Sequence, residues 1–128
     1  VDHDGARNLI DASKNANVKK FVMLSSMGAD KPEEATQLQD YLKAKHNADE
    51  YLKNSGLSYS IVRPGTLTNE PPLEMIELEQ KFDQHGKISR ADVAQTLLQS
   101  LKDGTAPNAT FEIVKGDSPI LKALEKVN

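Results

Sequence analysis

A phenol and an amine, Tyr41 and Lys45, lie four positions apart near the middle of the chain. Residues four apart share one face of a helix, so a helix through this segment would bring the two side chains together. A phenol, with a reference pKa of about 10, carries protons poorly at neutral pH unless a nearby cation favours its ionised form. Lys45 would supply that cation, and its ammonium has donors for a ribose hydroxyl. The spacing therefore indicates proton transfer beside a nucleotide.

The residues around this pair leave a second interpretation open. The predicted inward stripe of the helix consists of Tyr41, Ala44, Lys45, Ala48 and Leu52, and the solvated face of Gln39, Lys43, Asn47, Glu50 and Lys53. Lys45 could extend its ammonium to water from the edge of this stripe, and Tyr41 could be a core tyrosine with a satisfied hydroxyl. Ser25 and Ser26 favour the chemical interpretation, because a hydroxyl at a strand end can hold a substrate oxygen near the tyrosine.

Length and composition limit the class of protein. The 128 residues suffice for one domain at most, and the chain begins at Val1 instead of a methionine, just before an expected helix, so it is expected to be a piece of a longer protein. The formal net charge of −3 is spread along the chain, so neither nucleic acid nor a membrane surface is an expected partner. The chain has no cysteine and no long apolar run, which fits a cytoplasmic protein without disulfides, thiolate metal sites or membrane spans.

Strands and helices alternate along the chain with turn signals between them, a pattern typical of α/β proteins. The run Phe21–Leu24 lacks polar alternation, which indicates a strand covered on both faces, as in a parallel sheet. Pro64 cannot donate a backbone hydrogen bond, so with Gly65 it is expected to end a second strand at 59–62. Further strands are expected at 111–114 and, from a weaker pattern, at about 75–78.

Capping residues mark the expected helices. One helix should span about 4–15, and the helix of Tyr41 and Lys45 should end before Gly56, a residue suited to a left-handed cap. Ser89 should cap a third helix, and Pro119 should open a terminal one. The apolar residues expected to face inward on the first, third and last helices are Ala6, Leu9, Ile10 and Ala12; Val93, Leu97, Leu98 and Leu101; and Ile120, Leu121, Leu124 and Val127.

Several kinds of site are not expected. No two of the seven glycines lie within eight residues of each other, so neither a G-x-G-x-x-G turn nor a P-loop is present. The histidines are scattered, and the cluster Asp2-His3-Asp4 is interpreted as charge at a helix start, so no metal site is predicted. Ser26 lacks the G-x-S-x-G context and a paired histidine and acid, which argues against acyl-transfer hydrolysis.

Four ordered strings resemble the short-chain dehydrogenase/reductase superfamily: FVMLSS at 21–26, YLKAK at 41–45, SGLSYSIVRPG at 55–65 and SRADVA at 89–94. The match is closest to its atypical, NAD(P)-binding branch, the NAD-dependent epimerase/dehydratase-like or sugar-epimerase-like proteins. By this resemblance Tyr41 would be the acid/base, Lys45 its ribose-binding partner and Ser26 the hydroxyl that orients the substrate. The resemblance also implies that four residues border the nicotinamide: Ser25, Pro64, Gly65 and Thr66.

The resemblance implies an α/β fold, an NAD(P)-binding Rossmann-type doubly wound parallel sheet. The family's glycine-rich loop, its early strands and the residue that chooses between NAD and NADP would precede Val1, so residues 1–128 are expected to be the carboxyl-terminal part of that single domain. The intact protein is then expected to be an NAD(P)-dependent oxidoreductase or epimerase that acts on a small molecule by hydride transfer.

Two alternatives stay open at this point. One is a non-catalytic NAD(P)-binding regulator that senses redox state, and the other is an inactive structural half-domain. The isolated chain is expected to be inactive and to bind NAD or NADP weakly or not at all. Its expected partner is its own amino-terminal portion or a second copy, because an apolar strand at 21–24 without its upstream neighbour would be an exposed edge.

Overall fold

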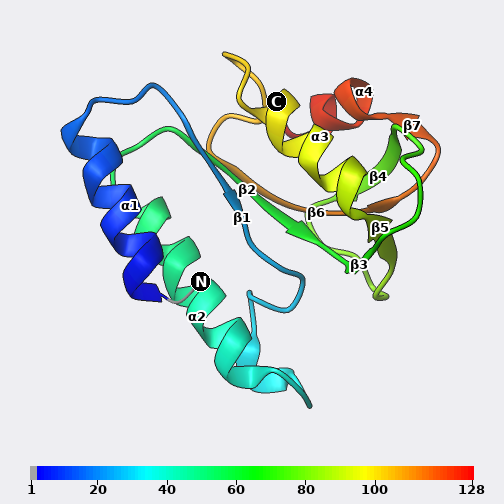
Figure 1. Ribbon diagram of the computed structural model, residues 1–128, viewed down its shortest axis with the longest axis horizontal. Coiled ribbons are helices and arrows are strands. Elements are labelled where there is room, and N and C mark those ends of the chain that lie inside the picture. Colours follow the sequence, from blue (N-terminus) through cyan, green and yellow to red (C-terminus); the bar gives the residue numbers. More distant parts are fainter. Residues whose placement is uncertain (1–2) are drawn as a thin grey trace.

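A five-stranded sheet forms the centre of the molecule in the computed structural model, which describes residues 3–128 (Figure 1). The spatial order of its strands is β1 (Phe21–Leu24), β2 (Tyr59–Pro64), β6 (Ala109–Lys115), β4 (Met75–Glu79) and β7 (Ser118–Pro119). The first three strands are parallel, which confirms the predicted α/β class. The pairs β4–β6 and β4–β7 are antiparallel and extend the sheet on one side, a feature that the sequence pattern did not indicate.

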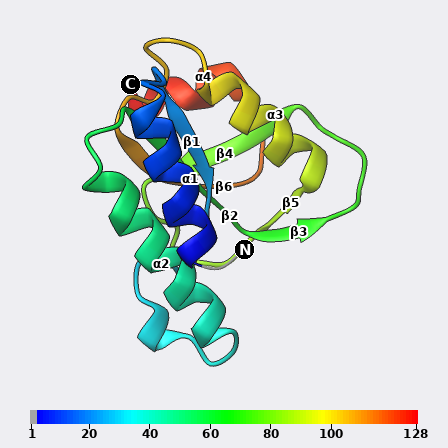
Figure 2. The same cartoon turned by 60° about the vertical axis from the view of Figure 1, so that its left-hand side comes forward.

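Helices cover both faces of the sheet, as Figures 1 and 2 show from two directions. On one face lie α1 (His3–Asn15) and α2 (Gln39–Lys53), and on the other α3 (Arg90–Ser100) and α4 (Ile120–Leu124). The alternation of side chains along β2 supplies both cores, because Ile61 packs in the cluster of α1 and α2 whereas Val62 packs in the cluster of α3 and α4. Both side chains are fully buried, in agreement with a strand covered on two faces.

Short elements outside the main sheet complete the fold. A parallel pair of three-residue strands, β3 (Thr66–Thr68) and β5 (Lys87–Ser89), forms a second sheet. The part of the chain that the structure describes also contains two 3₁₀ turns, η1 (Pro32–Glu34) and η2 (Glu125–Val127). The Ser89 hydroxyl accepts a hydrogen bond of 3.1 Å from the backbone N–H of Asp92, which confirms the predicted cap of α3.

No helix within residues 3–128 combines the length and the apolar character needed to cross a membrane.

The predicted end of β2 was two residues early, because the strand continues through Pro64. Proline lacks only the N–H, and the carbonyl oxygen of Pro64 accepts a hydrogen bond of 3.1 Å from the N–H of Met27. The left-handed backbone of Gly56, with a φ of 88°, agrees with its predicted place after α2.

The predicted inward faces of the helices were partly wrong. Six residues expected to face inward are exposed: Leu9, Ala12, Tyr41, Leu98, Leu101 and Leu121. On α3 the buried face carries small hydroxyl residues, and the hydroxyls of Thr96 and Ser100 each donate at 2.8 Å to a carbonyl oxygen four residues earlier. A side chain that satisfies its hydroxyl within its own helix can face the core, so apolar periodicity misplaced part of the buried face of α3. Val93 is buried and Leu97 packs against the core, as predicted.

Candidate active site

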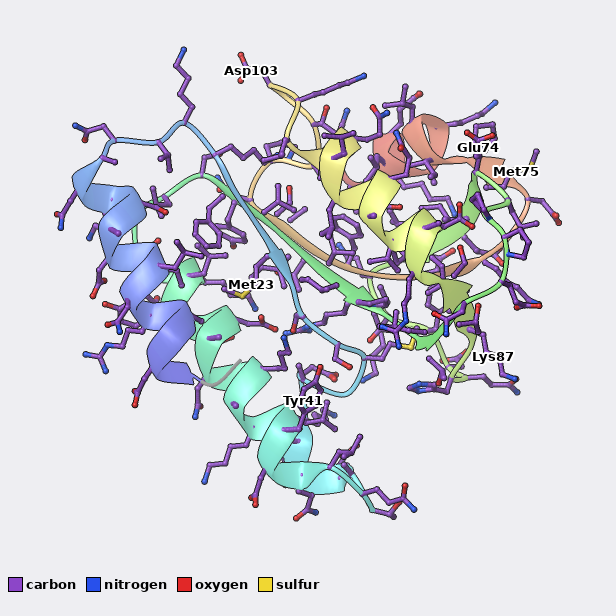
Figure 3. The ribbon with its side chains drawn as sticks, viewed as in Figure 1. Met23, Tyr41, Glu74, Met75, Lys87 and Asp103 are labelled. Carbon is purple, nitrogen blue, oxygen red and sulfur yellow. The ribbon has the colours of Figure 1, made fainter. Side chains whose placement is uncertain are left out.

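A pocket of about 610 Å³ opens where the carboxyl ends of β1 and β2 meet the first half of α2. Four residues singled out by the sequence line it together: Ser26, Tyr41, Gly65 and Thr66. Figure 3 shows the Tyr41 side chain beside α2, near the loop that follows β1. The carboxyl ends of parallel strands are the usual ligand-binding edge of such sheets, and the volume suits a small molecule.

Tyr41 and Lys45 lie on the same face of α2, as their spacing predicted. The ammonium nitrogen of Lys45 lies 5.5 Å from the centre of the Tyr41 ring and donates a hydrogen bond of 3.2 Å to the carbonyl oxygen of Leu24. The Tyr41 side chain is 46% exposed, so it is not a core tyrosine. Its phenol therefore stands at the pocket with a cation beside the ring.

The remaining predicted site residues are distributed around this pocket. Lys45 lines a second, apolar hollow of about 310 Å³ between α1, β1 and α2. The Ser26 hydroxyl lies in the first pocket and donates over 3.3 Å to the carbonyl of Met27, a long and therefore weak hydrogen bond. Ser25 and Pro64 are buried behind the pocket. These two residues thus support the site from beneath.

Gly65 sits where two backbone segments touch. A Cβ atom at Gly65 would lie 2.2 Å from the carbonyl oxygen of Gly86, a distance that no side chain can occupy. That carbonyl oxygen accepts a hydrogen bond of 2.9 Å from the N–H of Thr66, which joins the loop at 80–86 to the end of β2. The sequence marked Gly65 for its place in a motif, and the structure adds a steric reason for glycine.

The loop at 80–86 forms one wall of the pocket and is attached at two further points. The buried carboxylate of Glu112 accepts a hydrogen bond of 2.7 Å from the N–H of Phe82. Lys81 forms an ion pair with Asp30 from the loop after β1, and both side chains line the pocket. Burial would raise the pKa of Asp30, but the hydrogen bond and charge of Lys81 outweigh it and lower that pKa. The hydrogen bond to Asp30 raises the pKa of Lys81.

Sequence reasoning missed a buried network directly behind the predicted residues. The Ser25 hydroxyl donates at 2.7 Å to Oδ2 of Asp49, and Nε and Nη2 of Arg63 donate to the same oxygen at 3.2 and 3.0 Å. Burial raises the pKa of Asp49, although Ser25 and Arg63 oppose this shift. One signal was available in the sequence, because Asp49 follows Lys45 by four residues and must share its helix face.

A second missed anchor lies on α3. The carboxylate of Asp92 accepts hydrogen bonds from the N–H groups of Leu73 and Glu74 at 3.0 and 2.9 Å, and Nε of Arg90 donates at 3.0 Å to Asn69. These contacts hold the loop that follows β3.

Within residues 3–128, no group of three or more histidine, aspartate or glutamate side chains is arranged to bind a metal ion.

Comparisons with known proteins agree with this architecture. A family model described as NAD(P)H-binding matches residues 1–104. The chain is 41% identical over 128 residues to a Bacillus subtilis protein named uncharacterized sugar epimerase YhfK, and covers 59% of its length. It is 34% identical to sanguinarine reductase from Eschscholzia californica over 88% of this chain and 44% of that protein.

A solved structure gives the same result in three dimensions. A putative NAD-dependent epimerase/dehydratase from Bacillus halodurans superposes with a TM-score of 0.91 at 35% identity. The match covers 95% of this chain and 58% of that protein. The chain thus spans little more than half the length of the two Bacillus relatives and less than half of sanguinarine reductase, and its fold is the corresponding part of a Rossmann-type domain.

Proposed function

This chain belongs to the NAD(P)H-binding family, of the atypical short-chain dehydrogenase/reductase type, and from that premise we propose that the protein containing it is an NAD(P)-dependent oxidoreductase or epimerase. The proposed reaction is hydride transfer to or from a small-molecule carbonyl or hydroxyl group. The observation that carries the proposal is the arrangement of Tyr41 and Ser26 in one pocket with the Lys45 ammonium beside the Tyr41 ring.

Tyr41 is the proposed acid and base. In the direction of reduction its phenol donates a proton to the substrate oxygen, and in oxidation the phenolate takes that proton back. The Lys45 ammonium, 5.5 Å from the centre of the Tyr41 ring, places a positive charge beside the group that exchanges this proton. The Ser26 hydroxyl, which makes only a long hydrogen bond of its own, is free to turn toward the same substrate oxygen and hold it in place.

The residues present fit the nicotinamide and ribose end of NAD or NADP. The Lys45 ammonium has three donors, and the hydrogen bond to Leu24 uses one of them, which leaves donors for ribose hydroxyls. Gly65 and Thr66, which line the first pocket, would border the nicotinamide from the substrate side. When bound, the nicotinamide supplies or accepts the hydride. Residues 3–128 contain no glycine-rich turn for the pyrophosphate.

The names of the relatives support both branches of the proposal. One relative is named a sugar epimerase and another a reductase, and each shares about a third or more of its aligned residues with this chain. Both reaction types need a proton carrier next to the nicotinamide, which is the role proposed here for Tyr41.

The test uses the full-length protein with NADPH or NADH and two kinds of probe. Menadione and 4-nitrobenzaldehyde report carbonyl reduction through the loss of nicotinamide absorbance, and UDP-glucose reports epimerisation through product analysis. Turnover that is lost in Tyr41→Phe and kept in Tyr59→Phe, a tyrosine on β2 outside the pocket, supports the proposal. Cofactor binding without turnover of any probe would instead favour a redox-sensing regulator.

A further inference from the structure

Three buried polar side chains meet behind the pocket at one carboxylate oxygen. Asp49 has no exposed surface, and Ser25 and Arg63 are 3% and 7% exposed. Both other side chains donate to Oδ2 of Asp49, while Oδ1 has no hydrogen-bond partner among the described residues. Burying an ion pair with an unsatisfied oxygen is unfavourable, and apolar residues of similar size are often at least as stabilising. Stability alone is therefore a poor explanation for this cluster.

The position of Asp49 on α2 suggests what the cluster does. Lys45 and Asp49 occupy successive turns of one helix face, and they bind successive residues at the end of β1: Lys45 binds the carbonyl of Leu24, and Asp49 the hydroxyl of Ser25. Two attachment points fix both the rotation of a helix about its axis and its translation along the strand. The same two contacts therefore fix the direction in which Tyr41, one turn before Lys45, leaves α2.

Arg63 brings the second strand into the same cluster. Its guanidinium donates twice to the Asp49 carboxylate, and the chain then continues through Pro64 to Gly65 in the pocket. On the β1 side, Ser25 directly precedes Ser26, which also lines the pocket. The Asp49 carboxylate thus holds α2 and the ends of β1 and β2 at a common point. On each strand, its partner lies one or two residues before a residue that lines the pocket.

We propose that Asp49 is a positioning residue, which sets where Tyr41 stands relative to Ser26 by fixing the rotation of α2. The expected effect on turnover rests on the proposed function. The claim that Asp49 fixes the position of Tyr41 does not depend on any reaction. An error of about 1 Å in the placement of a reacting group can lower a rate about 10²-fold. A buried cluster of this kind is accordingly expected to affect turnover far more than cofactor binding.

Ser25→Ala in the full-length protein is the mildest test, because it removes one hydrogen bond and keeps the ion pair. Ser60→Ala is its matched control, since Ser60 is equally buried and donates at 2.7 Å to the carbonyl of Ala106 at the other end of β2. With tyrosines labelled with ¹³C at the ring carbon that bears oxygen, the NMR signal of Tyr41 should shift or broaden in Ser25→Ala only. An unchanged Tyr41 signal in Ser25→Ala would overturn the proposal.

Kinetics give the second arm of the test. With NADPH and menadione, kcat should fall about tenfold in Ser25→Ala and stay within twofold in Ser60→Ala, while the KM for NADPH stays unchanged in both. The double variant Asp49→Asn with Arg63→Gln removes both charges, so it should regain the thermal stability that Asp49→Asn alone loses, yet keep a low kcat. Recovery of kcat together with stability would mean that the cluster is merely structural. If the parent turns over no probe, the proposed function fails, and the Tyr41 signal alone decides the positioning role.

Discussion

The ammonium of Lys45 lies over the ring of Tyr41, 5.5 Å from its centre and one turn further along α2. A cation at this distance from an aromatic face is attracted by the ring electrons, and here the backbone carbonyl of Leu24 holds it as well. Lys45 is therefore tied to the end of β1 instead of extending into water. This arrangement is the basis of the first two predictions.

Tyr41→Phe should lower kcat of the full-length protein by about 10² to 10⁴-fold, the usual contribution of general acid and base catalysis. The affinity for NAD or NADP should hardly change, because the ring stays and only the hydroxyl is lost. Steady-state kinetics with menadione and NADPH measure kcat, and fluorescence titration measures affinity. An unaffected kcat would show that Tyr41 serves only in packing.

Lys45→Met should lower kcat and also weaken cofactor binding, since the proposed role of Lys45 includes the ribose. Methionine keeps much of the apolar stem and removes the charge and its donors. Lys43→Met, on the exposed side of the same helix, is the matched control. Titration of nicotinamide fluorescence should show a higher dissociation constant for Lys45→Met alone. Equal affinity in parent and variant would favour a lysine without a cofactor role.

The sequence was sufficient for the features that depend on local patterns. The order of strands and helices, the cap at Ser89 and the shared face of Tyr41 and Lys45 follow from periodicity and turn chemistry within a few residues. The strands β3 and β5 have only three residues each, which is too few to show a periodic pattern. They pair next to the point where the backbone of Gly86 contacts Gly65, a contact between distant parts of the chain.

The rest of the site depends on contacts between distant residues. Asp30 and Lys81 are 51 residues apart in the chain, and Asp49 and Arg63 are 14 apart on different elements, so neither pair produces a local signal. Burial of Asp49 is also contrary to what its residue type predicts, because an aspartate is seldom fully buried without a partner. Only the tertiary fold shows that Ser25 and Arg63 are its partners.

The ion pair between Asp30 and Lys81 should make the pocket wall depend on pH. The lowered pKa of Asp30 means that its contribution to stability is complete above its usual pKa of 3.8 and is lost as the pH falls through the lower folded value. The raised pKa of Lys81 means that its contribution holds up to 10.5 and is lost as the pH rises through the higher folded value.

Lys81→Met tests this dependence. Near neutral pH it should lower the free energy of unfolding by at most about 1 kcal/mol, since the Lys81 side chain is largely exposed and such pairs contribute little. Urea unfolding at several pH values should show a difference from the parent between about pH 4 and 10 that shrinks as the pH falls below 3.8. Lys31→Met, which breaks the exposed contact with Glu34, is the control and should have less effect. A difference that does not shrink in acid would mean that Lys81 acts through packing.

The 128-residue chain alone should bind NAD or NADP weakly or not at all. The pyrophosphate of these cofactors is normally held by backbone N–H groups at a glycine-rich turn and helix start, and these 128 residues contain no such turn. Isothermal titration calorimetry on this chain, with the full-length protein as the control, measures the difference. Micromolar affinity for the chain alone would reveal a phosphate site that the present residues do not suggest.

The last prediction concerns β1, which hydrogen-bonds to β2 on one side and has no strand on its other side among residues 3–128. Beside it lies the apolar hollow between α1 and α2, and Leu24 at the end of the strand is 38% exposed. An apolar edge with unpaired backbone groups favours pairing with another chain. We therefore expect the 128-residue chain, produced alone, to self-associate or to retain an amino-terminal peptide of the longer protein.

Light scattering combined with mass spectrometry tests this expectation directly. The matched variant Leu24→Lys adds a charge at the edge and leaves the backbone contact of Leu24 with Lys45 in place, so it should shift the chain toward monomer. Ala12→Lys, a substitution at an exposed position of α1 outside the hollow, should leave the association unchanged. A monodisperse 14.1 kDa parent with cooperative unfolding and no companion peptide would contradict the prediction. It would also mean that β1, which has four residues, offers too few unpaired backbone groups to pair with another chain.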